Sequence, residues 1–257
     1  MSLIVIKLGG SVVTYKNNHT PKPRFKVIRN ISKEILSLHK KGYKIILVHG
    51  GGSYGHNLAK KYNLTKGLKT ENSHIGLVKT VQSMSKLNFI IVDILEKIGL
   101  PAISFPSHSF ITQTNGNLNE FDPNIVKDVL NLGFIPVLYG DGVYDEKLGC
   151  SIISGDTIAT YLAKKLNAKK VIFLSDVDGI LDGTKLIPLV NNKNLNEVLK
   201  KIKIKNHKDI TGEMKGKILS IKKSLPGKKV SIINGLVEGN LTKVILGKVA
   251  GTKILFE

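Results

Sequence analysis

Residues 45–56 have the sequence IILVHGGGSYGH, and this stretch decides the fold. The continuous apolar run from Ile45 to Val48 is typical of a strand in a parallel sheet that helices cover on both faces. Glycine loses conformational entropy on folding, so three in a row indicate a close backbone approach rather than an ordinary turn. A glycine turn between a strand and a helix presents main-chain N–H groups to an anion. The sequence therefore predicts a phosphate site, with His56 as a further hydrogen-bond donor.

The first glycine turn of the chain follows the first predicted strand, in residues 3–11 (LIVIKLGGS), so the turn at 50–52 is the second. This strand would deliver Lys7 to the carboxyl edge of the sheet, where open α/β sheets bind ligands. Gly9 and Gly10 allow the backbone to approach a phosphate closely, and the lysine adds a positive charge. The Walker A order G-x-x-x-x-G-K-[ST] is absent here. The pattern fits either a second phosphate site or a tight strand-to-loop turn.

The rest of the chain alternates short apolar runs with segments of helical period. Helices are predicted over residues 25–39, 54–62, 73–98, 155–166, 194–202 and 212–225. Strands are predicted over residues 101–105, 134–139, 171–174, 230–233 and 252–256, with hairpins at 110–121 and 143–153. This alternation predicts an α/β fold with an open, mainly parallel sheet between layers of helices. We expect a single domain over residues 1–257, with an N-terminal lobe (1–168) and a C-terminal lobe (169–257) that share one sheet.

The basic composition restricts the possible partners. The formal net charge is +20, but only two of the 39 basic residues are arginines, Arg24 and Arg29. Recognition of base edges depends on the planar fork of arginine, so we expect no specific nucleic-acid partner. The lysines fit either a solvated surface or a polyanion partner.

Other features of the sequence favour a cytoplasmic protein without a membrane partner. The apolar runs are too short to span a bilayer, and Lys7 interrupts the only apolar segment near the start. Cys150 is the only cysteine, so no internal disulfide forms, and no Cys/His cluster has the spacing of a zinc site. We therefore predict no metal ion held by protein side chains alone.

Charged residues follow the ends of other predicted strands or open helices. Asp156 lies in Ser-Gly-Asp-Thr at a predicted helix start, where it either caps the helix or orients lysines. Asp176 and Asp178 follow the strand at 171–174 and fit either nucleotide or magnesium contacts or an Asx turn. Lys215 lies near the start of a predicted helix, where the dipole opposes a positive charge unless an anion is bound.

Taken in order, these segments closely resemble those of the amino acid kinase family over essentially the whole chain. Within it, the GGGSYGH stretch at 50–56 is most similar to members that phosphorylate isopentenyl phosphate, and Tyr-Gly-Asp at 139–141 agrees with that subgroup. The resemblance implies an α/β/α sandwich, ATP as the phosphate donor, Mg²⁺, a phosphomonoester substrate and a homodimer. Related kinases of fosfomycin, UMP or amino-acid carboxylates remain alternatives, as does a non-catalytic anion- or nucleic-acid-binding protein.

The resemblance also implies roles for individual residues. The residues expected to take part in catalysis are Lys7, Lys16, His56, Asp156 and Lys215. Asp156 is expected to pair with Lys7 and Lys215 and so to hold these two lysines at the transferred phosphoryl group. The residues expected to hold the acceptor phosphate are Gly51, Gly52, His56 and Gly155. The residues expected to bind ATP are Lys7, Gly9, Gly10, Ser11, Asp176, Gly212 and Lys215.

Three points depart from the family or stay open. Tyr15 stands where members often carry aspartate, which leaves the pose of Lys16 open, and Thr157 replaces the commoner second aspartate. A prenyl tail would need an apolar pocket, and the candidate lining residues, which are equally explained as core, are Ile75, Val78, Val81, Met84 and Phe105.

Overall fold

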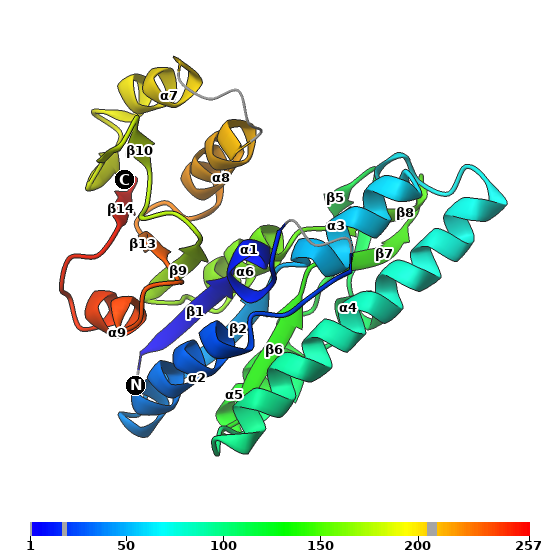
Figure 1. The fold of residues 1–257 in the computed structure, drawn as a ribbon, viewed down its shortest axis with the longest axis horizontal. Coiled ribbons are helices and arrows are strands. Elements are labelled where there is room, and N and C mark those ends of the chain that lie inside the picture. The colour runs from blue at the N-terminus through cyan, green and yellow to red at the C-terminus, as the bar shows by residue number, and fades with distance from the viewer. Residues whose placement is uncertain (1, 17–19, 205–209) are drawn as a thin grey trace.

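The fold is built around one eight-stranded sheet with helices on both faces (Figure 1). The structure is a computed structural model that describes residues 2–16, 20–204 and 210–257. It does not describe the side chains of residues 203–213. In spatial order the strands are β12 (Leu189–Asn191), β14 (Thr252–Leu255), β13 (Lys229–Asn234), β9 (Lys170–Ser175), β1 (Leu3–Leu8), β2 (Lys44–His49), β6 (Ile135–Tyr139) and β3 (Ala102–Ser104). All neighbours are parallel except β13 and β14. The predicted α/β/α sandwich is confirmed.

Alternate side chains of the central strand face the two helical layers. Ile4 and Ile6 of β1 belong to the core on one face, whereas Val5 belongs to the core on the other. The helices whose buried residues join the first core are α1 (Gly10–Val13), α2 (Phe25–Lys40), α3 (Gly52–Lys61), α4 (Glu71–Lys97) and α9 (Asn240–Ile245). Those that join the second core are α5 (Asn124–Asn131), α6 (Gly155–Lys165), α7 (Leu195–Ile204) and α8 (Ile210–Ser224). Helices on both faces explain why the central strands are continuous apolar runs.

A smaller sheet lies beside the main one. Its strands, in order, are β5 (Asn117–Leu118), β4 (Thr112–Thr114), β7 (Asp141–Asp145) and β8 (Gly149–Ile153). The buried carboxylate of Asp145 accepts hydrogen bonds from the backbone N–H groups of Asn115 and Gly116 and from the Ser151 hydroxyl. One side chain thus joins the two predicted hairpins, both of which are present.

The predicted elements match the structure to within about three residues at each end, and the differences lie in very short elements. No pattern in the sequence indicates α1, the hairpin of β10 (Leu181–Asp182) and β11 (Lys185–Leu186), or β12. Elements of two to four residues are too short to show a hydrophobic period. Within the described ranges, no helix is both long and apolar enough to cross a bilayer.

Candidate active site

The strand ends of the main sheet open into a cavity of about 340 Å³. Leu8 at the end of β1 pairs with His49 at the end of β2 and with Leu174 near the end of β9. The loops that leave these three strands therefore begin side by side, which places their polar residues at one edge of the sheet. This is the edge at which open parallel sheets bind ligands.

The two glycine turns touch each other through their backbones. A Cβ atom on Gly10 would lie 2.3 Å from the Gly52 nitrogen, and one on Gly50 would lie 2.9 Å from the Gly10 nitrogen. Gly52 also has a φ of +48°, a conformation that other residues rarely adopt. Glycine is required at these positions because one main chain packs directly on another. The two turns that the sequence predicts separately form one structure at the cavity wall.

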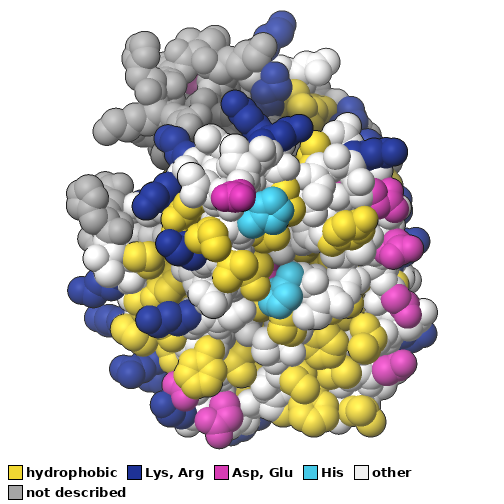
Figure 2. Space-filling view, turned by 90° about the vertical axis from the view of Figure 1, so that its right-hand side faces the viewer, with side chains coloured by type: hydrophobic (Ala, Val, Ile, Leu, Met, Phe, Trp, Pro, Cys, Tyr) yellow, Lys and Arg dark blue, Asp and Glu magenta, His cyan; other side chains and the backbone are white. Residues whose placement is uncertain are grey.

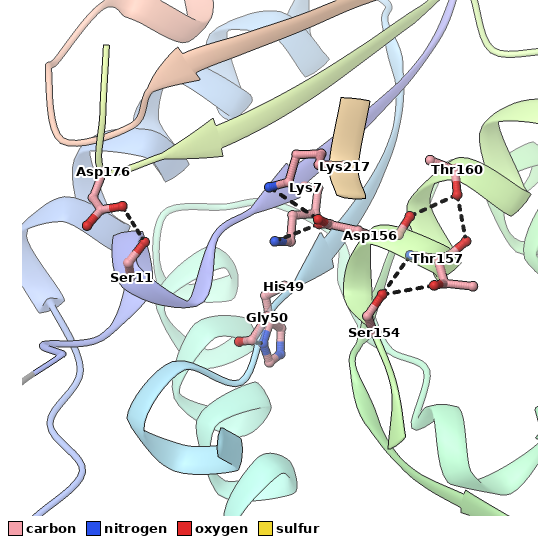
Figure 3. A network of polar contacts seen from close by, with 10 residues as sticks. All are labelled: Lys7, Ser11, His49, Gly50, Ser154, Asp156, Thr157, Thr160, Asp176 and Lys217. Atoms are coloured by element: carbon pink, nitrogen blue, oxygen red, sulfur yellow. Dashed lines mark hydrogen bonds and ion pairs between the residues drawn. The ribbon is translucent and has the colours of Figure 1, made fainter. Parts of the chain in front are cut away.

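Asp156 holds two lysines at the cavity (Figure 3). Its Oδ1 lies 2.7 Å from Lys7 Nζ, and its Oδ2 lies 3.1 Å from Lys217 Nζ. Burial alone would raise the pKa of Asp156, but the two lysines outweigh burial and lower it to about 2. The hydroxyl of Ser154 caps α6 by accepting the Thr157 N–H. The carboxylate of Asp156 is therefore a lysine partner and not the helix cap.

The lysine paired with Asp156 corrects the expectation that named Lys215. Lys217, two residues further along α8, makes the contact and lines the cavity together with Met214. Two residues turn an α-helix by about 200°, so these lysines point to different sides. Lys217 precedes the buried Ile218 and is itself buried, whereas Lys215 is partly exposed. The surroundings of Gly212, expected to bind ATP, lie outside the described side chains.

A second ion pair lies on the other side of the glycine turns. Lys16 Nζ is 2.7 Å from Asp176 Oδ2, and the Ser11 hydroxyl donates to Asp176 Oδ1 at 2.9 Å. Burial raises the pKa of Asp176, but the bonds from Lys16 and Ser11 outweigh it, so the net shift is downward. The neighbouring Asp178 instead accepts a hydrogen bond from the Asn234 amide. The sequence leaves the pose of Lys16 open. In the structure its side chain forms an ion pair with Asp176 at the cavity wall.

The cavity brings together most of the predicted site residues. Those that line it are Lys7, Gly9, Gly10, Ser11, Lys16, Gly51, Gly52, His56, Gly155, Asp156 and Asp176. His56 lies one turn into α3, whose N-terminus is at the cavity, and Gly155 opens α6 beside it. The positive ends of both helices therefore face the space in which an anion would bind.

The cavity also has an apolar part. Met84 of α4, Ala59 of α3 and Ile152 of β8 line it. Two of the expected tail-pocket residues, Ile75 and Val78, are instead about half exposed, at 53% and 52%. The interior stripe of α4 runs through Thr80, Met84 and Leu87, and its spacing of four and three residues turns Ile75 and Val78 outward. Of the expected set, Met84 is a cavity residue.

Sequence reasoning missed three side chains at or near the cavity. Lys217 could have been found from the buried stripe of its helix. Asp141 lines the cavity and accepts a hydrogen bond from His108 at 2.7 Å. Burial raises the pKa of Asp141, although the contact with His108 opposes the shift. Thr14, buried behind the glycine turns, carries no sequence signal of its own.

His49 is the last residue of β2, and its buried side chain contacts the glycine turn at residues 50–52. Its ring is fully buried and stacks on Tyr139, with ring centroids 5.1 Å apart. The Asn88 amide group donates to Nε2 at 3.2 Å, so the proton lies on Nδ1, which donates to the Gly50 carbonyl at 3.1 Å. Burial is the largest cause that lowers the pKa of His49, to about 4. A neutral imidazole thus fixes the first glycine of the turn.

Comparison with known proteins identifies the family. The profile of the Amino acid kinase family matches residues 2–234. The chain belongs to this family. An isopentenyl phosphate kinase from Methanocaldococcus jannaschii is 37% identical over 99% of both chains, and one from Methanothermobacter thermautotrophicus is 31% identical over 98% of both.

Solved structures agree with this assignment. One isopentenyl phosphate kinase structure, 29% identical, matches 98% of this chain and 100% of its own with a TM-score of 0.81. A UMP kinase from Bacillus anthracis, 19% identical, matches 99% of this chain and 96% of its own with a TM-score of 0.66. The second likeness shows the shared fold alone.

The buried His49 predicts a pH dependence of stability. The ordinary pKa of histidine is about 6.5, so on acidification the unfolded chain gains this proton before the folded one. The free energy of unfolding should therefore fall between pH 6.5 and about 4, by on the order of 3 kcal/mol from this residue. Urea denaturation across this range should show a smaller fall for His49→Gln. The same change at the exposed His74 should leave the fall intact, and an unchanged slope in His49→Gln would contradict the prediction.

Proposed function

We propose that the protein transfers the γ-phosphoryl group of ATP to isopentenyl phosphate, giving isopentenyl diphosphate and ADP. The observation that carries this proposal is the pair of glycine turns, at residues 9–10 and 50–52, the latter of which is followed by His56 at the cavity wall. An acceptor that already carries a phosphate needs its own anion site beside that of ATP. The names of the most similar relatives support the same substrate.

The two anion sites would take different ligands. We assign the acceptor phosphate to His56 and the N–H groups of Gly51, Gly52 and Gly155. The apolar part of the cavity, with Met84, would take the hydrocarbon tail. The residues that we assign to ATP are Lys7, Gly9, Gly10, Ser11, Asp176, Gly212 and Lys217. Lys217 takes the place expected for Lys215 because it is the lysine held beside Lys7.

The chemistry would be a direct in-line transfer. The attacking atom is an oxygen of an anionic phosphate, so no general base is needed to generate it. The barrier is the approach of two anions, which Lys7, Lys217 and the helix N-termini would offset by stabilising negative charge on the transferred group. Asp156 would hold the two lysines apart at fixed positions, and Lys16 would add charge from the other side.

Magnesium would enter with ATP. The cavity carboxylates of Asp141, Asp156 and Asp176 are engaged by His108 or by lysines. The described part of the chain contains no group of three or more potential metal-ligating side chains. These residues fit a Mg²⁺ ion that phosphate oxygens and water hold, as is common for this ion. The ion would neutralise part of the phosphate charge during transfer.

We further propose an arrangement of two lobes and a homodimer in the cytoplasm. The N-terminal lobe (1–168) would bind the acceptor and contribute Lys7, Gly9, Gly10 and Ser11 to the phosphates of ATP, and the C-terminal lobe (169–257) would bind the rest of the nucleotide. Hydrophobic side chains gather on the lower part of the face seen in Figure 2, which supports a protein partner. Phe89 of α4 is 71% exposed, and Ile103 is exposed on the edge strand β3. A second copy could cover both.

A coupled assay tests the proposed reaction. With ATP, Mg²⁺ and isopentenyl phosphate we expect ADP release and formation of the diphosphate. Replacing His56 with alanine should lower kcat/KM for isopentenyl phosphate by about a hundredfold, because a donor to the acceptor phosphate is lost. UMP, fosfomycin and acetylglutamate serve as alternative acceptors. Turnover of one of these without turnover of isopentenyl phosphate would overturn the proposal, and an unchanged rate in His56→Ala would remove His56 from it.

A pair of lysine variants tests the assignment at Asp156. Lys217→Ala should lower kcat by at least about a hundredfold, because it removes a charge held at the transferred group. Lys215→Ala removes the same charge two residues away and should change kcat by less than about threefold. Steady-state kinetics of both variants test the assignment, since a greater loss of kcat in Lys215→Ala than in Lys217→Ala would favour Lys215 as the lysine at the transferred group.

The proposed dimer has its own test. In analytical ultracentrifugation at micromolar concentration we expect a dimer for the unmodified chain and a monomer for Phe89→Glu, because the new charge would be buried at the interface. Val249, which is 85% exposed in the other lobe, provides the control, and Val249→Glu should remain dimeric. A monomeric unmodified chain would refute the dimer without affecting the assigned reaction.

A further inference from the structure

The side chain of Thr14 joins the two glycine turns. Its hydroxyl donates to the Gly10 carbonyl at 2.8 Å and accepts the Ser53 N–H at 3.1 Å. The first partner belongs to the turn after β1 and the second to the turn after β2. Thr14 is fully buried. It does not line the cavity, so it acts on the two turns from behind.

Thr14 supplies a cap that α3 does not have in its own sequence. The residue at the N-cap position is Gly51, which has no side chain to accept a hydrogen bond. One of the free N–H groups in the first turn of α3 is therefore satisfied by a hydroxyl from 39 residues earlier in the chain. A Cβ atom on Gly52 would lie only 2.1 Å from this hydroxyl oxygen. The glycine at 52 thus makes room for the Thr14 side chain.

The backbone of Thr14 is itself held in place. Residues 13–15 pair with residues 22–24, through Arg24 N–H to the Val13 carbonyl and Tyr15 N–H to the Lys22 carbonyl. The Arg24 side chain also donates from Nε to the Thr14 carbonyl at 3.1 Å, and its guanidinium stacks over the Tyr15 ring at 4.2 Å. Because the main chain of Thr14 is fixed and its hydroxyl is buried, its hydrogen bonds hold the two glycine turns in a single relative position.

We propose that Thr14 is a positioning residue that sets the separation of the two glycine turns. This inference rests on the proposed function, in which one turn holds ATP and the other the acceptor phosphate. In-line transfer needs the reacting atoms about 3–3.5 Å apart, and a displacement of about 1 Å can cost a hundredfold in rate. Thr14 would therefore determine the distance between the two ligands without contributing to the affinity of either.

Two variants without the hydroxyl test this role. Thr14→Val replaces the oxygen that lies 2.8 Å from the Gly10 carbonyl with a methyl group, which pushes the turns apart. Thr14→Ala removes the link without adding bulk, and so remains informative if the valine variant does not fold. We expect both to lower kcat for isopentenyl phosphate by about 30- to 100-fold, with each KM within about threefold of the unmodified value. Thr14→Ser keeps the hydroxyl and should retain a rate close to that of the unmodified chain.

Calorimetry separates positioning from a general loss of structure. The probes are ADP, isopentenyl phosphate, and a compound that joins adenosine to an isopentenyl group through a polyphosphate chain. We expect Thr14→Ala to bind the two single ligands normally and the joined compound at least about tenfold more weakly, because only the joined compound spans both turns. The number of ligand molecules bound per protein chain gives the fraction of the variant that is folded. Dividing the measured kcat by this fraction corrects it for unfolded protein.

The possible results lead to different conclusions. A corrected kcat within about threefold of the unmodified value, or an equal loss of affinity for single and joined ligands, would overturn the positioning role. If the unmodified chain does not use isopentenyl phosphate, the proposed function fails. The same kcat comparison, made with whichever acceptor it does use, then still decides the role of Thr14.

Discussion

The contact between the main chains of Gly10 and Gly50–Gly52 is the constraint on which the rest of the site depends. A Cβ atom on Gly10 or Gly50 would meet the backbone of the other turn, so the two turns lie in van der Waals contact and line one cavity. This closeness is what a reaction between two phosphate groups requires, because neither ligand has to be brought to the other by a large movement. Parallel pairing of β1 with β2, with Leu8 opposite His49, places the turns side by side in the first place.

Two anions bound at the proposed sites would repel each other, and the surrounding charges can offset that repulsion. Two anions at such a separation repel strongly in a partly desolvated cavity. Lys7 and Lys217 lie on one side of the turns and Lys16 lies on the other, and each is fixed by an aspartate. The low pKa of Asp156, about 2, keeps its charge over the working range of pH, so the two buried lysines stay paired when no ligand is bound.

The sequence carries the larger part of this arrangement, and its failures have physical causes. The continuous apolar strands and the amphipathic helices are visible because periodicity over several residues reports burial, and glycines after strands report close approach. Lys215 is predicted from the family resemblance and from its place near the helix start, whereas the buried stripe of α8 places Lys217 beside Asp156. The links made by Thr14 and Asp141 join segments distant in the chain, and no local pattern records such contacts.

The fold by itself does not select an acceptor, since a UMP kinase shares it at 19% identity. Selection must therefore come from the few side chains that make the two glycine turns unlike. In the proposed assignment, the first turn lies beside Lys7, whose positive charge would favour the polyphosphate of ATP. The second turn lies beside His56 and the apolar wall with Met84, which in the same assignment would favour a single phosphate on a hydrocarbon. In this proposal two glycine turns would acquire different specificities from the side chains beside them, and the contact between the turns would bring the two ligands into one reaction site.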